Sequence, residues 1–204
     1  MVRYPLMVVS IALLSYESAT AANLVTQGKP GCVIVLGDDA IPAEKTAATE
    51  LQSFVQQMSG AQLPVIASAT ASKDQCRVFI GMTALTKSVL PNFKWETLVH
   101  DGILIKRVGS DLVLAGDRPR GTLYAVYEFL ESLGVRFIAP DETVIPGMPT
   151  ILFPETDTVY VPKLQYRETT YQRVIRKNPS FCARLRLNGH HHPIPVEYGG
   201  NNTI

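Results

Sequence analysis

Two amphipathic segments constrain the fold of this chain more than any other feature. Residues 42–60 (PAEKTAATELQSFVQQMSG) and 117–134 (DRPRGTLYAVYEFLESLG) each carry one apolar stripe at helical spacing. Each has a proline near its start and a glycine at its end, which is typical of helix boundaries. The stripes consist of Ala47, Leu51, Phe54, Val55 and Met58, and of Leu123, Val126, Tyr127, Leu130 and Leu133. Such stripes need a second layer to cover them.

Short β-branched runs bounded by glycine or proline supply that layer. The runs at 31–37, 63–67, 77–82 and 135–140 predict strands, and DGILIKRVGSDLVLAG (101–116) predicts a hairpin. We therefore expect an α/β (α+β) fold, in which a mixed β-sheet carries two long helices on one face.

Composition narrows the classes of partner. The 204 residues are 46% hydrophobic and 18% charged, with a formal net charge of +1. A balanced charge lacks the basic surface that nucleic-acid binding requires, so we expect no nucleic-acid partner. No phosphate-binding glycine loop occurs. VIVLGDDA places Gly-Asp-Asp after a strand but lacks the further glycines of a nucleotide site.

The N-terminus has the three parts of a secretory signal. Arg3 precedes an apolar run from Leu6 to Leu14, and Ala19-Thr20-Ala21 follows. The run is too short to span a bilayer, so we expect no stable membrane span. We predict a signal peptide over residues 1–21 and a secreted or periplasmic mature chain.

Export would make a disulfide chemically reasonable. Cys32 and Cys76 each open a strand-like run that ends on glycine, and they can pair if the two strands are parallel neighbours in matching register. Two ordinary buried or edge thiols remain the alternative. Cys182 would be the odd residue, and no C-x-x-C motif occurs.

The order of these motifs resembles a known family. AATELQSFVQQMSGAQLPV, RVFIG and DGILIKRVGSDLVLAGDRPRGTLYAVYEFLESLGVRFIAPDETVIP follow one another in residues 24–161. They resemble the N-terminal domain of bacterial alpha-glucuronidases and the second domain of chitobiases and beta-hexosaminidases. The resemblance implies an α/β sandwich beside a TIM barrel that carries the catalytic carboxylates. It implies that residues 162–204 begin such a barrel, and that this chain contains no catalytic residue and no cofactor.

The same resemblance implies one sugar-binding residue. In beta-hexosaminidases an arginine at the end of the first barrel strand holds sugar hydroxyls, and Arg167 stands at the matching position. Glu168 follows it where the family usually has glycine.

Three consecutive histidines, His190 to His192, follow in the same tail. Consecutive residues of an extended strand point to opposite sides, so we expect no metal site. Their position after the first barrel strand makes His191 and His192 candidates for sugar contacts.

Paired acids and basic residues elsewhere have simpler explanations. Glycosidases need two carboxyl groups across the scissile bond, but adjacent acids on a strand or turn point apart. Charged runs are more often solvated surface. The pairs are Asp38-Asp39, Glu128/Glu131 and Asp141-Glu142. Arg118 and Arg120 would bind an anion at the helix start or pair structurally with Asp117.

Two functions follow. The first is a non-catalytic accessory domain of a secreted glycoside hydrolase-like protein, inactive alone, that meets a carbohydrate substrate through a catalytic domain lying elsewhere. The alternative is a stand-alone carbohydrate-binding or cell-surface adhesion module. Sugar-stacking candidates for the alternative are Trp95, Tyr124 and Tyr127.

Overall fold

A computed structural model describes residues 23–72, 74–171 and 177–202; the predicted signal peptide, residues 1–21, lies outside the described residues. Within the described part, the central sheet has six strands in the order β11-β6-β7-β5-β3-β4. Their bounds are β3 Cys32–Leu36, β4 Val65–Ala67, β5 Cys76–Ile80, β6 Ile103–Val108, β7 Asp111–Gly116 and β11 Thr158–Tyr160. The sheet is mixed: β4, β3, β5 and β7 are parallel, while β6 is antiparallel to both β7 and β11.

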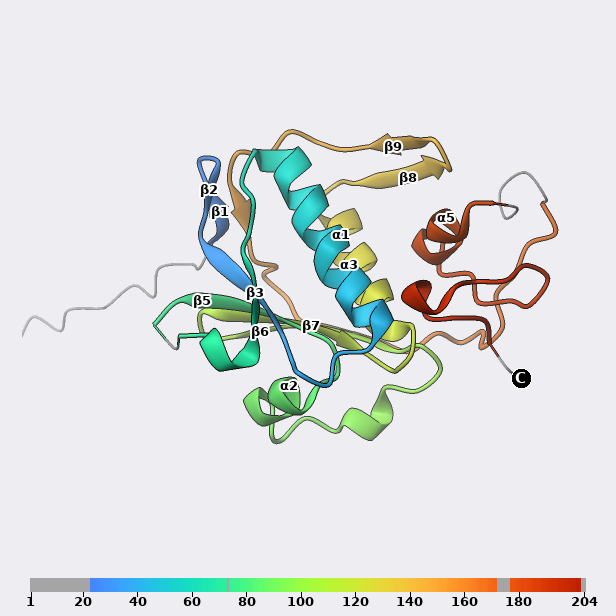
Figure 1. Cartoon of the computed structure of the whole chain (residues 1–204), viewed down its shortest axis with the longest axis horizontal. Helices are drawn as coiled ribbons and strands as arrows, with labels where there is room; N and C mark the ends of the chain where they lie inside the picture. Colours follow the sequence, from blue (N-terminus) through green and yellow to red (C-terminus); the bar gives the residue numbers. More distant parts are fainter. Residues whose placement is uncertain (1–22, 73, 172–176, 203–204) are drawn as a thin grey trace, which may run out of the picture.

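The two predicted long helices lie side by side on one face of this sheet (Figure 1). They are α1 (Pro42–Ser59) and α3 (Gly121–Ser132). The short helix α2 (Ala84–Val89) covers the opposite face with the 3-10 turn η2 (Trp95–Thr97); η1 (Ser68–Thr70) is a further such turn. The predicted α/β arrangement, a mixed sheet with both long helices on one face, is confirmed.

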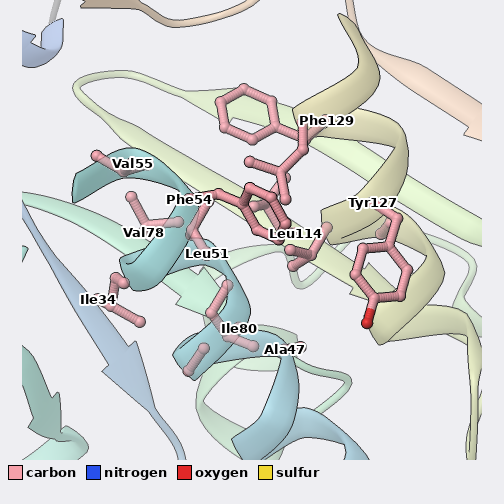
Figure 2. Close-up of a cluster of buried hydrophobic side chains, with 14 of the residues drawn as sticks. Ile34, Ala47, Leu51, Phe54, Val55, Val78, Ile80, Leu114, Tyr127 and Phe129 are labelled. Carbon is pink, nitrogen blue, oxygen red and sulfur yellow. The ribbon is translucent and has the colours of Figure 1, made fainter. Parts of the chain in front are cut away.

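Alternation along the strands sorts side chains between the two faces. Figure 2 shows Ile34, Val78 and Leu114 of the sheet among Leu51 and Tyr127 of the helices. On the other face, the main buried residues are Val35, Phe79, Leu90, Leu98, Leu104 and Val113. The sheet is therefore covered on both sides, and its parallel strands are mostly apolar, as buried parallel strands usually are.

Helix α3 begins later than its sequence pattern suggests. The amphipathic segment starts at residue 117, but the residue before the first helical turn is Arg120. The cause lies in close packing of the backbone, because a Cβ on Gly121 would collide with the carbonyl of Gly102 and with the backbone of Gly116. Glycine at 121 lets the helix start directly against the end of β7, and residues 117–120 form the approach to it.

Smaller strands flank this core. β1 (Asn23–Thr26), β2 (Lys29–Pro30) and β10 (Ile151–Leu152) form a small antiparallel sheet. β8 (Arg136–Ala139) and β9 (Glu142–Val144) form a ribbon beyond α3.

The end of the chain packs on the same domain (Figure 1). Residues 163–171 and 177–202, here called the C-terminal segment, contain α5 (Pro179–Arg184) and the turn η3 (Val196–Tyr198). α5 contacts α3 and β8, and η3 contacts α1. No strand occurs in this described part of the segment. The start of a barrel over 162–204 therefore stays a prediction.

Across the described ranges, no helix combines the length and the apolar character needed to cross a bilayer.

Candidate functional site

A buried carboxylate joins the α/β domain to the C-terminal segment. Asp101, in the turn before β6, is 2% exposed and has a positive φ of 66°. Its Oδ1 accepts a hydrogen bond from Arg120 Nε at 2.9 Å. Its Oδ2 accepts from Arg167 Nη2 at 2.6 Å and from Asn188 Nδ2 at 3.0 Å. These four residues, here called the Asp101 hub, come from three parts of the chain and satisfy one another.

Arg167, the predicted sugar-binding residue, has every guanidinium nitrogen engaged within the protein. Besides the Asp101 contact, Nε donates to the Arg186 carbonyl and Nη1 to the Leu164 carbonyl, both at 2.7 Å. The guanidinium also lies 5.7 Å from the centre of the Tyr124 ring, within reach of a cation–π interaction. The geometry makes Arg167 a clamp on the C-terminal segment, and its role in sugar binding stays a prediction.

A cleft of about 500 Å³ opens beside the hub. Its walls come from β6, β11, α3 and the C-terminal segment. Arg167 lies in its lining together with Ile103, Tyr124, Tyr160, Glu128 and Arg186. Small-molecule sites commonly have this size, with an apolar lining and a few polar groups. This cleft is the candidate functional site.

The charges in the cleft are paired with one another. Arg186 Nη2 contacts Glu128 Oε2 at 3.0 Å and also binds Glu131. The buried Tyr124 hydroxyl donates to the Leu187 carbonyl at 3.2 Å. Burial, and then the charge of Asp101, raise the pKa of Tyr124 well above its ordinary value. The phenol therefore stays protonated and keeps its hydrogen bond at physiological pH.

The three histidines lie apart from the cleft lining, around Glu168. The Glu168 carboxylate accepts from the His191 backbone N–H at 2.6 Å and lies 2.8 Å from His191 Nδ1. It also accepts from the Tyr166 hydroxyl, and that hydroxyl lies 3.1 Å from His190 Nδ1. Desolvation opposes ionisation of Glu168, but the hydrogen bonds from Tyr166 and His191 outweigh it and lower its pKa.

His192 lies in different surroundings from His191. Its Nε2 is buried without a hydrogen-bond partner, beside a small hollow that Cys182 and Ile194 also line. The structure thus places Arg167 in the cleft and leaves both His191 and His192 outside it, so their sugar contacts stay a prediction. In the described ranges, no group of three or more His, Cys, Asp or Glu side chains is placed to hold a metal ion.

The two cysteines at the strand starts are joined by a disulfide. β3 and β5 are parallel neighbours, and Cys32 is the register partner of Cys76. Their Cα atoms lie 4.5 Å apart, within the range that a disulfide spans. The bond closes a separation of 44 residues. Both cysteines could be singled out from the sequence, but their register could not, because it depends on the order of the strands in the sheet.

The two arginines before α3 pair with carboxylates far away in sequence rather than with Asp117. Arg118 Nη2 contacts Glu44 Oε2 at 3.0 Å and Asp39 Oδ2 at 3.4 Å, and Arg120 belongs to the Asp101 hub. Asp117 accepts instead from the Asp101 backbone N–H at 3.3 Å. Both arginines therefore serve tertiary structure, and their anion-binding role has no support here.

Glu44 fills the position where α/β folds often bind a nucleotide. That position is the crevice at the carboxyl ends of two parallel strands whose following helices cover opposite faces, here β3 and β5. Glu44 is fully buried there and accepts from the backbone N–H groups of Ile41 and Met82, both at 2.9 Å. With Arg118 closing the carboxylate from outside, the crevice is occupied by the protein itself.

The aromatic candidates for sugar stacking are placed poorly for that task. Tyr124 and Tyr127 are 1% and 0% exposed and belong to the core. Trp95 packs edge-on against Phe93, with ring centres 5.0 Å apart, on the face of the sheet away from α1 and α3. The exposed aromatic residue of the cleft is instead Tyr160, at 53%. Nothing in the sequence pointed to Tyr160, since a tyrosine in a short edge strand carries no distinguishing pattern.

Comparison of the sequence with known protein families gives a match. Residues 13–129, more than half of the chain, match the family described as Glycosyl hydrolase family 67 N-terminus. The chain belongs to this family. The resemblance to the N-terminal domain of alpha-glucuronidases is thereby confirmed, and the chain has a carbohydrate-related context.

A solved structure shows the same fold. It is a family GH115 4-O-methyl-alpha-glucuronidase, BtGH115A, described as having specificity for decorated arabinogalactans. The similarity has a TM-score of 0.59 at 16% identity and covers 81% of this chain. The chain spans 25% of the length of that protein. At this identity the likeness concerns the fold alone. No curated protein matches the chain.

Proposed function

We propose that this chain is a non-catalytic accessory domain of a secreted glycoside hydrolase-like protein that acts on a polysaccharide or glycan. The observation that carries the proposal is the family match over residues 13–129, which names an N-terminal region of glycosyl hydrolases. The likeness to a quarter of a much longer glucuronidase supports an accessory position within a larger protein.

The carboxylates of the cleft support a non-catalytic role. Glycoside hydrolysis needs one carboxyl group that donates a proton to the leaving oxygen and a second that acts from the other side of the sugar. Both oxygens of Asp101 already accept hydrogen bonds from Arg120, Arg167 and Asn188. Glu128 is paired with Arg186. The acid and its partner would then be supplied by a catalytic domain of the larger protein.

Export from the cytoplasm is part of the same proposal. The signal predicted over residues 1–21 motivates it, and the Cys32–Cys76 disulfide supports it because structural disulfides persist mainly in oxidising compartments. Finding the protein only in the cytoplasm, with residues 1–21 still attached, would contradict this part.

An activity screen tests the proposal. The 204-residue chain should not hydrolyse aryl glycosides, including glucuronides and N-acetylhexosaminides, whereas a longer protein containing a catalytic domain should. A Glu128→Gln variant serves as control, because it removes the more exposed acid of the cleft. Turnover by the chain that is lost in this variant would overturn the proposal.

A further inference from the structure

The cleft beside the Asp101 hub has groups that no contact within the protein uses. Thr158 and Tyr160 are two residues apart on β11, so their side chains lie on the same side of the strand, and both line the cleft. Among the residues that the structure describes, neither hydroxyl has a hydrogen-bond partner in the protein. Both hydroxyl groups are therefore available to a ligand in the cleft.

Tyr160 provides a flat surface at the mouth of the cleft. It is 53% exposed, and its backbone pairs with Ile103 on β6, which also lines the cleft. Pairing within the sheet holds the backbone of Tyr160 in place, so presenting the ring costs little additional ordering. A tyrosine ring of this kind can pack against the C–H face of a sugar while its hydroxyl remains in water.

The polar groups of the cleft favour a neutral ligand. Arg167 is paired with Asp101, and Arg186 with Glu128 and Glu131, so each cation already has its anion. A carboxylate or phosphate ligand would have to displace one of these acids. A hydroxyl group can instead donate to the outer oxygen of a paired carboxylate and accept from a paired arginine without breaking the pair.

We propose that this cleft binds a short neutral saccharide, with one sugar ring packed on Tyr160 and its hydroxyls bonded to Thr158 and to the Glu128–Arg186 pair. The choice of a saccharide rests on the proposed function, whereas the neutral charge and the position of the ring rest on the cleft itself. The site would hold the accessory domain on a glycan while catalysis takes place elsewhere in the protein.

Saturation-transfer NMR and calorimetry on the full chain test the proposal. The probes are xylobiose, cellobiose and galactobiose, with glucuronic acid at the same concentration as the charged comparison. At least one neutral disaccharide should bind, and more tightly than glucuronic acid. Tyr160→Ala should weaken that binding roughly tenfold, the order expected for loss of an aromatic contact, while Tyr160→Phe keeps the ring and most of the affinity.

Tyr171→Ala is the matched control, because Tyr171 is 66% exposed and does not line the cleft. Its binding should equal that of the unaltered chain. The proposal is overturned if none of the neutral disaccharides binds, if Tyr160→Ala binds as tightly as the control, or if glucuronic acid binds best. Failure of binding together with turnover by the longer protein would reject the cleft proposal alone and leave the proposed function standing.

Discussion

At the scale of single residues, Asp101 links the α/β domain to the C-terminal segment. Its carboxylate brings together the start of α3 and two points of the C-terminal segment, through Arg120, Arg167 and Asn188. Removing one partner from a buried ion pair leaves the remaining charges desolvated and uncompensated. The intact hub therefore adds little to the free energy of unfolding, whereas removing one of its members should lower that free energy strongly.

Asp101→Asn should lower the free energy of unfolding by about 3–5 kcal/mol, the usual cost of breaking a buried pair. Asparagine fits the positive φ of this residue, so the loss comes from the charge and not from backbone strain. Urea denaturation measures it. The control is Asp157→Asn, which removes the exposed partner of Lys106 and should cost at most about 1 kcal/mol. Equal losses for the two variants would contradict the role of the hub.

Local sequence carried little sign of this hub. His100 and Asp101, just before Gly102 and β6, are as typical of an ordinary turn as of a functional site. Asn188 lies in a stretch without helix or strand periodicity. The family resemblance singled out Arg167, and the structure places this residue in the cleft lining. The resemblance could not show that all three guanidinium nitrogens would bind groups within the protein. The pairing of Arg167 with Asp101 joins residues that are 66 positions apart in the chain.

At the scale of elements, the parallel strands β3 and β5 give the domain its covalent link. The disulfide joins the first residues of both strands and therefore lies at their amino ends. The Glu44 crevice lies at the opposite, carboxyl ends of the same strands. Helix α1 and strand β4 lie within the loop that the disulfide closes. The bond thus reduces the conformational entropy of the unfolded chain over the segment β3-α1-β4, which is expected to form a right-handed crossover.

Replacing both Cys32 and Cys76 by alanine should lower the free energy of unfolding by about 2–4 kcal/mol. The disulfide restricts the conformations of the unfolded chain, and without it the unfolded state regains that entropy. Thermal denaturation of the two proteins measures the difference. Adding a reductant should destabilise the unaltered chain by a similar amount and leave the double variant unchanged. A reductant effect of equal size on both proteins would show that the bond is not the cause.

At the scale of the whole molecule, the C-terminal segment shares a core with the α/β domain. Phe181 and Ala183 of α5 belong to the same buried cluster as α1 and α3. Arg184 of that helix pairs with Glu50 of α1 at 3.0 Å, and its guanidinium lies 5.3 Å from the ring centres of both Phe54 and Phe137. We therefore expect the segment and the domain to unfold together.

Phe181→Ala tests this coupling, because Phe181 is 3% exposed within the shared core. The substitution should lower the free energy of unfolding of the whole chain by about 3–5 kcal/mol, as removal of a buried phenylalanine ring usually does. Urea denaturation should still show a single transition. Val196→Ala, at a residue that is 70% exposed, is the control and should change stability by at most about 0.5 kcal/mol. A main transition that Phe181→Ala leaves unmoved would mean that the segment folds independently.

The type and order of the main elements followed from local sequence, because helical stripes, β-branched runs and their glycine and proline boundaries are local properties. The sequence also indicated the family, through motifs that keep their order over residues 24–161. Three further features became visible only in the folded chain. They are the register that joins Cys32 to Cys76, the three partners of Asp101 and the exposure of Tyr160 in the cleft. The physical reason is that pairing, burial and register depend on strand order and on contacts between distant segments, which no local pattern encodes.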